Sequence, residues 1–161
     1  MSAKAASAPQ SPVDPAARPE VFLFPSWRGQ GIYCDAFGVP NGRYEIWGHG
    51  ETQADGSVVI EMNTRLDIGT SNHFEWVISP SSELRFPLYD RVTGQQASGV
   101  ITATGFGWSW NLLHRTPLGV RRCRVEGMFN LRGPAEASTS TTMTLWGVAV
   151  GSSSSHIRHL R

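Results

Sequence analysis

The stretch Gly99-Val-Ile-Thr-Ala-Thr-Gly-Phe-Gly-Trp-Ser-Trp-Asn-Leu-Leu113 decides how the rest of the chain can fold. Its second half places small or polar residues on one face of an extended strand and, on the other face, Phe106, Trp108, Trp110 and Leu112. A period of two with aromatic residues on one side indicates a half-buried strand. Gly105 indicates either two antiparallel strands or one strand that bends sharply. Such a strand needs a sheet to lie in and an apolar interior to face.

The same alternation recurs along the chain, most clearly between residues 57 and 68. Turn signals such as Asn41-Gly42 and Asp55-Gly56 separate the alternating segments. We find no convincing amphipathic helix, and the turn signals recur roughly every 8–12 residues, which is typical of an all-β sandwich or barrel. Short hairpin turns favour a meander. We therefore predict an all-β fold, a single antiparallel up-and-down β-barrel of about 8–10 strands, wide enough to enclose one small ligand.

The domain organisation follows from composition. Residues 1–19 are rich in Ala, Ser and Pro, which predicts a disordered leader, residues 20–151 form the barrel, and residues 152–161 form a flexible tail. Trp27, beside Gly29 and Gly31, is a candidate plug for one end of the barrel. No segment resembles a signal peptide, and none approaches the roughly 20 apolar residues of a membrane-spanning helix. The expected location is therefore the cytoplasm.

Charge and cysteine content narrow the class of partner. The formal net charge is +1 and charged residues make up 17% of the chain, so neither nucleic acid nor a membrane is expected as a partner. Cys34 and Cys123 are predicted to be free thiols, although a bridge between them stays open. No metal is expected, because His156 and His159 have no third ligand in sight. No phosphate loop or dinucleotide fingerprint is present, and no cofactor is expected.

The order of several short motifs resembles a known family. The matching pieces are Asp35-Ala-Phe-Gly38, Ile46-Trp-Gly48, Asp67-Ile-Gly69 followed by Trp76, Asp90 through Val92-Thr-Gly94 to Gly99, Gly107-Trp108 and Trp146-Gly-Val-Ala-Val-Gly151. Together they resemble a bacterial lipocalin-like family defined as a domain of unknown function, many members of which are predicted lipoproteins. The resemblance implies a calycin-type barrel and no particular activity. The chain departs from the family in lacking a lipoprotein signal.

Aromatic residues form the first candidate site. We expect a small hydrophobic or aromatic ligand to bind in the barrel against Tyr44, Trp76, Trp108, Trp110 and Trp146. Arg122 is the candidate to pair with an anionic end of such a ligand. The alternative is that these rings simply fill the barrel, as side chains do in small barrels.

A charged strand face forms the second candidate. If Glu61 and Arg65 point inward, they are candidate catalytic residues, with Glu61 as a general base whose pKa burial would raise. The protein would then be a cofactor-free lyase, isomerase or cyclase, with Tyr44 and Arg122 assisting. The interpretation favoured here is that this face is solvated, as in most antiparallel sheets.

A third hypothesis is structural. The Thr-rich segment Ser138–Val150 is predicted to be one strand, with Trp146 on its inward face. As an edge strand it would allow two copies to pair, which predicts a homodimer.

Overall fold

The described residues form ten strands. The structure is a computed structural model that describes residues 26–78, 85–102, 104–116 and 119–160, with the backbone alone at 112 and 114–116. The predicted leader, residues 1–19, and the predicted inward face of Leu112 lie outside what is described. The strands are β1 (Ser26–Cys34), β2 (Pro40–Thr52), β3 (Val58–Leu66), β4 (Ser71–Ile78), β5 (Arg85–Asp90), β6 (Gln95–Ile101), β7 (Gly105–Thr116), β8 (Gly119–Gly133), β9 (Glu136–Leu145) and β10 (Val148–His159).

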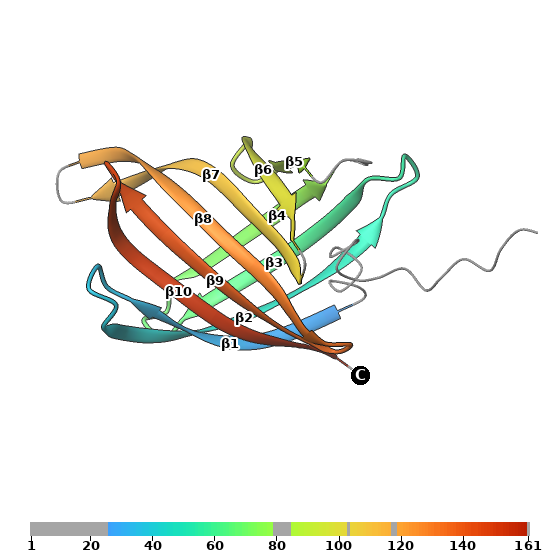
Figure 1. The fold of residues 1–161 in the computed structure, drawn as a ribbon, viewed down its shortest axis with the longest axis horizontal. Coiled ribbons are helices and arrows are strands. Elements are labelled where there is room, and N and C mark those ends of the chain that lie inside the picture. The colour runs from blue at the N-terminus through green and yellow to red at the C-terminus, as the bar shows by residue number, and fades with distance from the viewer. Residues whose placement is uncertain (1–25, 79–84, 103, 117–118, 161) are drawn as a thin grey trace, which may run out of the picture.

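The strands close into a single barrel. Each strand pairs antiparallel with its neighbours in sequence, and the first pairs with the last, from Trp27 opposite His159 to Cys34 opposite Ser152. Figure 1 shows the strands running obliquely along the barrel, with the β1–β2 and β9–β10 turns together at one end. The predicted fold class is confirmed: this is an all-β, lipocalin-like, up-and-down barrel. The described residues contain no helix of the length and apolarity that crossing a bilayer requires.

The predicted C-terminal tail was wrong. Residues 152–159 belong to β10, whose backbone pairs with β1 on one side and β9 on the other. The serine run Ser152–Ser155 suggested an end to ordered structure, but hydrogen bonding on both edges and the burial of Ser155 and Ile157 hold the strand in place. The same pairing removes the edge on which the homodimer hypothesis rested, because β9 lies between β8 and β10.

The turn predicted at Asn41-Gly42 was also wrong. The chain reverses at Asp35–Gly38, where the Asp35 Oδ1 atom accepts hydrogen bonds from the backbone N–H groups of Phe37 (2.9 Å) and Val39 (3.0 Å). Gly42 lies within β2, opposite Tyr33. Its hydrogen side chain leaves room for the Tyr33 ring, because a Cβ atom there would lie 2.2 Å from the phenolic oxygen.

The barrel has a closed end and an open end. At the closed end Trp27, Phe106, Phe129 and Ile157 are buried, and the Phe106 and Phe129 rings stack with centroids 5.0 Å apart. Trp27, the predicted plug, is 2% exposed. We call the opposite end the mouth; it carries the turns of residues 35–39, 67–70 and 146–147. The ends of β7 and β8 at which Thr116 pairs with Gly119 lie at the same end.

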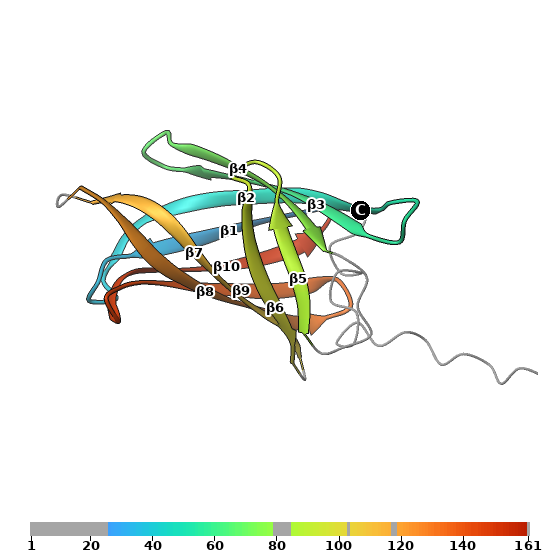
Figure 2. The same ribbon diagram turned by 90° about the horizontal axis from the view of Figure 1, so that it is seen from above.

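The β5–β6 hairpin interrupts the wall. Figure 2 shows this hairpin crossing the barrel more steeply than the other strands. Among the described residues, β5 pairs with β4 only at Trp76–Ile78, and β6 pairs with β7 only at Phe106–Ser109. Buried Asp90 secures the hairpin, accepting hydrogen bonds from the Thr93 hydroxyl (2.5 Å) and the Glu75 backbone N–H (3.1 Å). The mouth halves of β4 and β7 therefore extend beyond the strands that lie between them.

A candidate ligand cavity

The inward side chains enclose a cavity of about 730 Å³ that opens at the mouth. Its floor is the buried aromatic layer of the closed end. Its walls are mainly apolar and come from β2, β3, β4, β7, β8 and β9, including Ile46, Ile60, Met62, Phe74, Val125 and Met143. A volume of this size falls within the range of pockets that hold a cofactor-sized or drug-sized ligand.

Glycines opposite aromatic residues keep the cavity open. Across the ladders, each of five inward aromatic residues lies opposite a glycine, and a Cβ atom added at that glycine would come within 2.1–2.7 Å of the aromatic side chain. The side chains therefore rest against the backbone of the opposite strand instead of projecting across the lumen. The pairs are Tyr33 with Gly42, Tyr44 with Gly31, Trp27 with Gly48, Phe86 with Gly99, and Trp108 with Gly127.

Aromatic contacts join β4 and β7 past the β5–β6 hairpin that lies between them. The ring centroid of Trp76 on β4 lies 5.4 Å from that of Trp108 and 5.6 Å from that of Trp110 on β7, both edge-on. The ring centroids of Phe74 and Trp110 lie 5.9 Å apart. Edge-to-face rings at these separations attract one another beyond simple burial. These four residues, Phe74, Trp76, Trp108 and Trp110, form what we call the aromatic seam.

The seam holds polar groups that lack partners. The indole N–H groups of Trp76 and Trp110 are buried, and neither finds an acceptor among the described residues; the same holds for Trp27 on the floor. A buried donor without an acceptor costs about 1–3 kcal/mol. Two such donors on residues that line one cavity suit a ligand that carries hydrogen-bond acceptors.

Polar side chains gather at the mouth. The Tyr33 hydroxyl donates to Asp67 Oδ1 (2.9 Å), and the Arg43 backbone N–H donates to Asp67 Oδ2 (2.8 Å). The Arg43 N–H, followed by the Tyr33 hydroxyl, lowers the pKa of Asp67 below its usual value, and the hydrogen bond to Asp67 raises the pKa of Tyr33. Asp35 is the one carboxylate among the described lining residues.

Four of the predicted ligand-binding residues line the cavity. Tyr44 lies on β2, Trp76 on β4, and Trp108 and Trp110 on β7. Their alternation in the sequence placed them correctly, and binding by them stays a prediction.

Two predicted ligand-binding residues do not reach the cavity. Trp146 is in the β9–β10 turn and is 73% exposed, because the strand predicted over Ser138–Val150 ends at Leu145. Arg122 is exposed on the outer face of β8, because Cys123 and Val125 take the inward positions beside it. Neither residue lines the cavity, and the predicted pairing of Arg122 with an anionic ligand end has no geometric basis.

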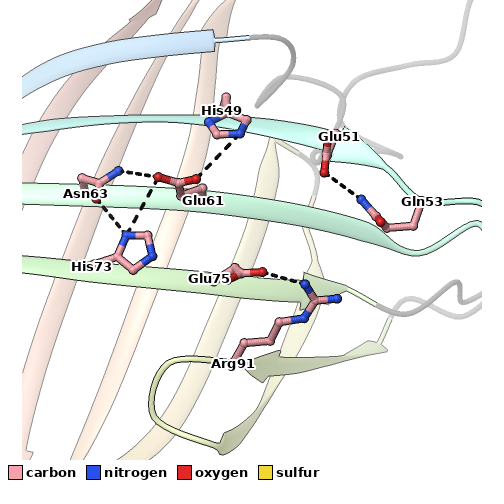
Figure 3. A network of polar contacts seen from close by, with 8 residues as sticks. All are labelled: His49, Glu51, Gln53, Glu61, Asn63, His73, Glu75 and Arg91. Carbon is pink, nitrogen blue, oxygen red and sulfur yellow. Dashed lines mark hydrogen bonds and ion pairs between the residues drawn. The ribbon is translucent and has the colours of Figure 1, made fainter.

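Glu61 and Arg65 also face away from the cavity, since Ile60, Met62 and Leu66 take the inward positions of β3. Figure 3 shows Glu61 within an outer network, with its Oε2 atom 3.8 Å from His49 Nε2 and its Oε1 atom 3.2 Å from Asn63 Nδ2. Arg65 pairs with Glu45, its Nη2 atom 2.6 Å from Oε2. In this position neither residue can contact a molecule inside the barrel.

Other lining residues were missed. Phe74 shares the inward face of β4 with Trp76, and this spacing of two was the signal available for it. Tyr33 reaches the mouth because the first turn lies at Asp35–Gly38, earlier in the chain than predicted. Asn72 shares the inward face of β4 with Phe74, at the mouth end of that strand.

The thiols and potential metal ligands stay apart. Cys34 is half-buried at the mouth and Cys123 is fully buried, and both are free. Within the part of the chain that the structure describes, no three His, Cys, Asp or Glu side chains lie close enough to hold a metal ion.

Comparison with known proteins supports the fold. The chain is similar to the S-type phycobiliprotein lyase CPES from Guillardia theta, with a TM-score of 0.67, 12% sequence identity, and coverage of 89% of this chain and 92% of that one. No family model matches the chain, and no curated protein matches it. At this identity the likeness shows the lipocalin-like barrel, and the narrower family suggested by the short motifs stays a prediction.

Proposed function

We propose that the protein binds one small, largely apolar and aromatic molecule in the barrel cavity. The observation that carries this proposal is the cavity of about 730 Å³ with the aromatic seam on its wall. Two buried indole N–H groups without acceptors favour a ligand that carries carbonyl, ether or ring-nitrogen acceptors. A protein that only needed a filled core would gain stability by closing this space.

The ligand we propose is uncharged at its buried end. Within the described lining, Asp35 is the one formally charged side chain, and it lies at the mouth. A carboxylate buried without a partner is strongly disfavoured. An anionic ligand group would therefore remain outside the mouth, in water.

The test is direct binding with a matched pair of variants. Thr141 lines the cavity from β9, whereas its neighbour Thr142 is exposed on the outer face. We expect the polarity-sensitive dye Nile red to bind the wild type and Thr142→Phe saturably, and Thr141→Phe at least about tenfold more weakly. Equal binding by the two variants, or no saturable binding by the wild type, contradicts the proposal. The dye then serves in displacement assays with neutral aromatic compounds and with biliverdin, a linear tetrapyrrole chosen because the structural neighbour is a phycobiliprotein lyase.

A second candidate is a cofactor-free lyase or isomerase activity on the bound molecule. The name of the structural neighbour favours it, as does the presence of Asp35, Tyr33 and Tyr44 among the residues that line the cavity. Asp35 is the candidate acid or base, because it is the carboxylate nearest a bound ligand. Mass spectrometry of each displacing ligand after incubation tests this. Conversion that disappears in Asp35→Asn while dye affinity is kept supports catalysis, and recovery of every ligand unchanged refutes it for the compounds tested.

A further inference from the structure

The mouth is surrounded by exposed apolar side chains. Of the large hydrophobic residues described, the seven with the greatest exposure all lie at this end, and they include Phe37 at 91%, Ile68 at 73% and Trp146 at 73%. The others are Val39, Leu113, Val120 and Val148. We call these seven residues the apolar rim. Leu160 at the opposite end, next in order of exposure, is 53% exposed.

The rim follows the barrel from strand to strand. Ile68 is in the β3–β4 turn, and Phe37 and Val39 are in the β1–β2 turn. Trp146 is in the β9–β10 turn, and Val148 directly follows that turn as the first residue of β10. These turns are neighbours, because β1 pairs with both β2 and β10, and β2 pairs with β3. Leu113 and Val120 continue the series at the mouth ends of β7 and β8. Exposed apolar groups gathered on one face mark a contact surface, whereas single scattered ones do not.

Trp146 has an unfavourable backbone conformation. Its φ is +51° and that of Gly147 is +80°, and Leu145 pairs with Val148 across them. This is the geometry of a two-residue type I′ hairpin turn, which prefers Asn-Gly and is disfavoured for a bulky residue at the first position. Trp146 is too exposed for packing in the core to offset the cost of this conformation. An exposed tryptophan held at such a position is expected to serve a contact outside the chain.

Three of the described arginines that have no carboxylate partner lie at the same end; a fourth, Arg132, lies at the opposite end and donates to the Ser138 hydroxyl. Arg28, Arg65, Arg91, Arg124 and Arg158 each pair with a glutamate along the barrel wall. Arg43, Arg121 and Arg122, near the mouth, have no carboxylate within ion-pair distance among the described residues. The two mouth aspartates, Asp35 and Asp67, accept backbone N–H groups of neighbouring residues. Counted against these two aspartates, the three arginines leave the described side chains of the mouth with a formal excess of one positive charge.

We propose that the apolar rim docks the barrel mouth onto the surface of a lipid bilayer. Apolar side chains on separate turn tips can enter the headgroup region one by one without a matching protein surface. Tryptophan is favoured at that depth, and the three arginines complement anionic headgroups. The cavity then opens directly toward a phase in which an apolar molecule dissolves. Overall composition gave no reason to expect a membrane partner, because the charge excess is local.

The test is flotation of the full chain with vesicles. We use vesicles of pure phosphatidylcholine and of phosphatidylcholine mixed with phosphatidylglycerol. We expect the wild type to bind the mixed vesicles several-fold more tightly, and Phe37→Ser and Trp146→Asn each to lower the partition coefficient by at least about tenfold. Leu160→Ser, an exposed apolar residue at the opposite end, is the matched control and should leave binding unchanged.

Trp146→Asn also separates contact from folding. Since Asn-Gly suits the turn, this variant should melt about 2–4 °C higher than the wild type, and it should still bind Nile red in solution. The proposal is overturned if neither vesicle binds the wild type, or if Leu160→Ser weakens binding as much as Phe37→Ser. A third outcome also overturns it: the wild type dimerises with rising concentration, the rim variants stay monomeric, and none of these proteins binds vesicles. The apolar rim would then be the contact surface between two copies of the chain.

Discussion

The most informative single substitution is Gly127→Ala in β8. Gly127 lies opposite Trp108, and a Cβ atom added there would be 2.1 Å from both Cε2 and Cζ2 of the indole. Carbon atoms in contact are normally about 3.5–4.0 Å apart, so the ring must move by about 1.5 Å. The ring centroids of Trp76 and Phe106 lie 5.4 and 5.7 Å from that of Trp108, so the movement of Trp108 disturbs the aromatic seam.

The magnitude follows from two opposing terms. Forcing extra volume into a packed site costs about 1–3 kcal/mol. Replacing glycine in a strand returns about 0.5–1 kcal/mol. From the middle of each range, the free energy of unfolding should therefore fall by about 1 kcal/mol, which corresponds to a decrease in Tm of roughly 2–4 °C for a chain of this length. The displaced indole should also enter the lumen and weaken Nile red binding.

Gly107→Ala is the matched control, on the neighbouring strand. A Cβ atom at Gly107 would meet its nearest neighbours at 3.5–3.7 Å, which is ordinary contact. This variant should be at least as stable as the wild type. Urea unfolding followed by far-ultraviolet circular dichroism measures both variants, and near-ultraviolet circular dichroism reports the indole environment. If Gly127→Ala is as stable as Gly107→Ala and its near-ultraviolet spectrum is unchanged, the glycine does not make room for the ring and the reasoning fails.

Three further predictions concern the mouth and the seam. The folded-state pKa of Asp67 is lowered, so its contribution to stability is present above the unfolded pKa of about 4 and is lost as the pH falls through the lower folded value. Urea midpoints measured from pH 6 to pH 2 should therefore fall less steeply for Asp67→Asn than for the wild type, and parallel curves would contradict this. Trp76→Phe removes a buried N–H group that has no partner among the described residues, so Tm should stay within about 2 °C of the wild type. The affinity for ligands that carry hydrogen-bond acceptors should fall about 3–10-fold in the displacement assay, and an unchanged affinity would contradict the assigned role. Asp35→Asn should tighten binding of anionic dyes relative to neutral ones, as measured by fluorescence titration, and an equal effect on both would show that the carboxylate does not influence selection by charge.

Most of the fold could be predicted from the alternation of apolar and polar residues along the strands. The inward faces of β3, β7 and β8 could be assigned because a period of two separates large apolar residues from small, polar or charged ones over many positions. The same signal placed Trp76, Trp108 and Trp110 in the cavity wall. The outward facing of Glu61 could also be anticipated, since the opposite face of that strand needed a core.

The wrong predictions concern segments whose structure depends on strand pairing or on their position in the barrel, and not on their composition. Asn41-Gly42 is a strong turn signal, yet the tight space beneath Tyr33 explains that glycine within a strand. Ser152–Ser155 lacks apolar alternation and is ordered by ladders on both edges. Trp146 was placed on the face of Thr142 and Thr144, which is the outward face of β9, and it also lies past the end of the strand, in the turn. None of these features is local enough to be read from a short window of sequence.

The ladder between β1 and β10 has a consequence for the order of folding. It joins residues 118 to 132 positions apart, from Cys34 with Ser152 to Trp27 with His159, so its loop-closure entropy is the largest of any pairing in the barrel. Hairpins from β2 to β9 can form from local contacts first, and the sheet then remains an open, curled ribbon whose first and last edges await each other. Closure should therefore be the slow step, and the half-closed ribbon, with its apolar lumen uncovered, is the species most prone to aggregate.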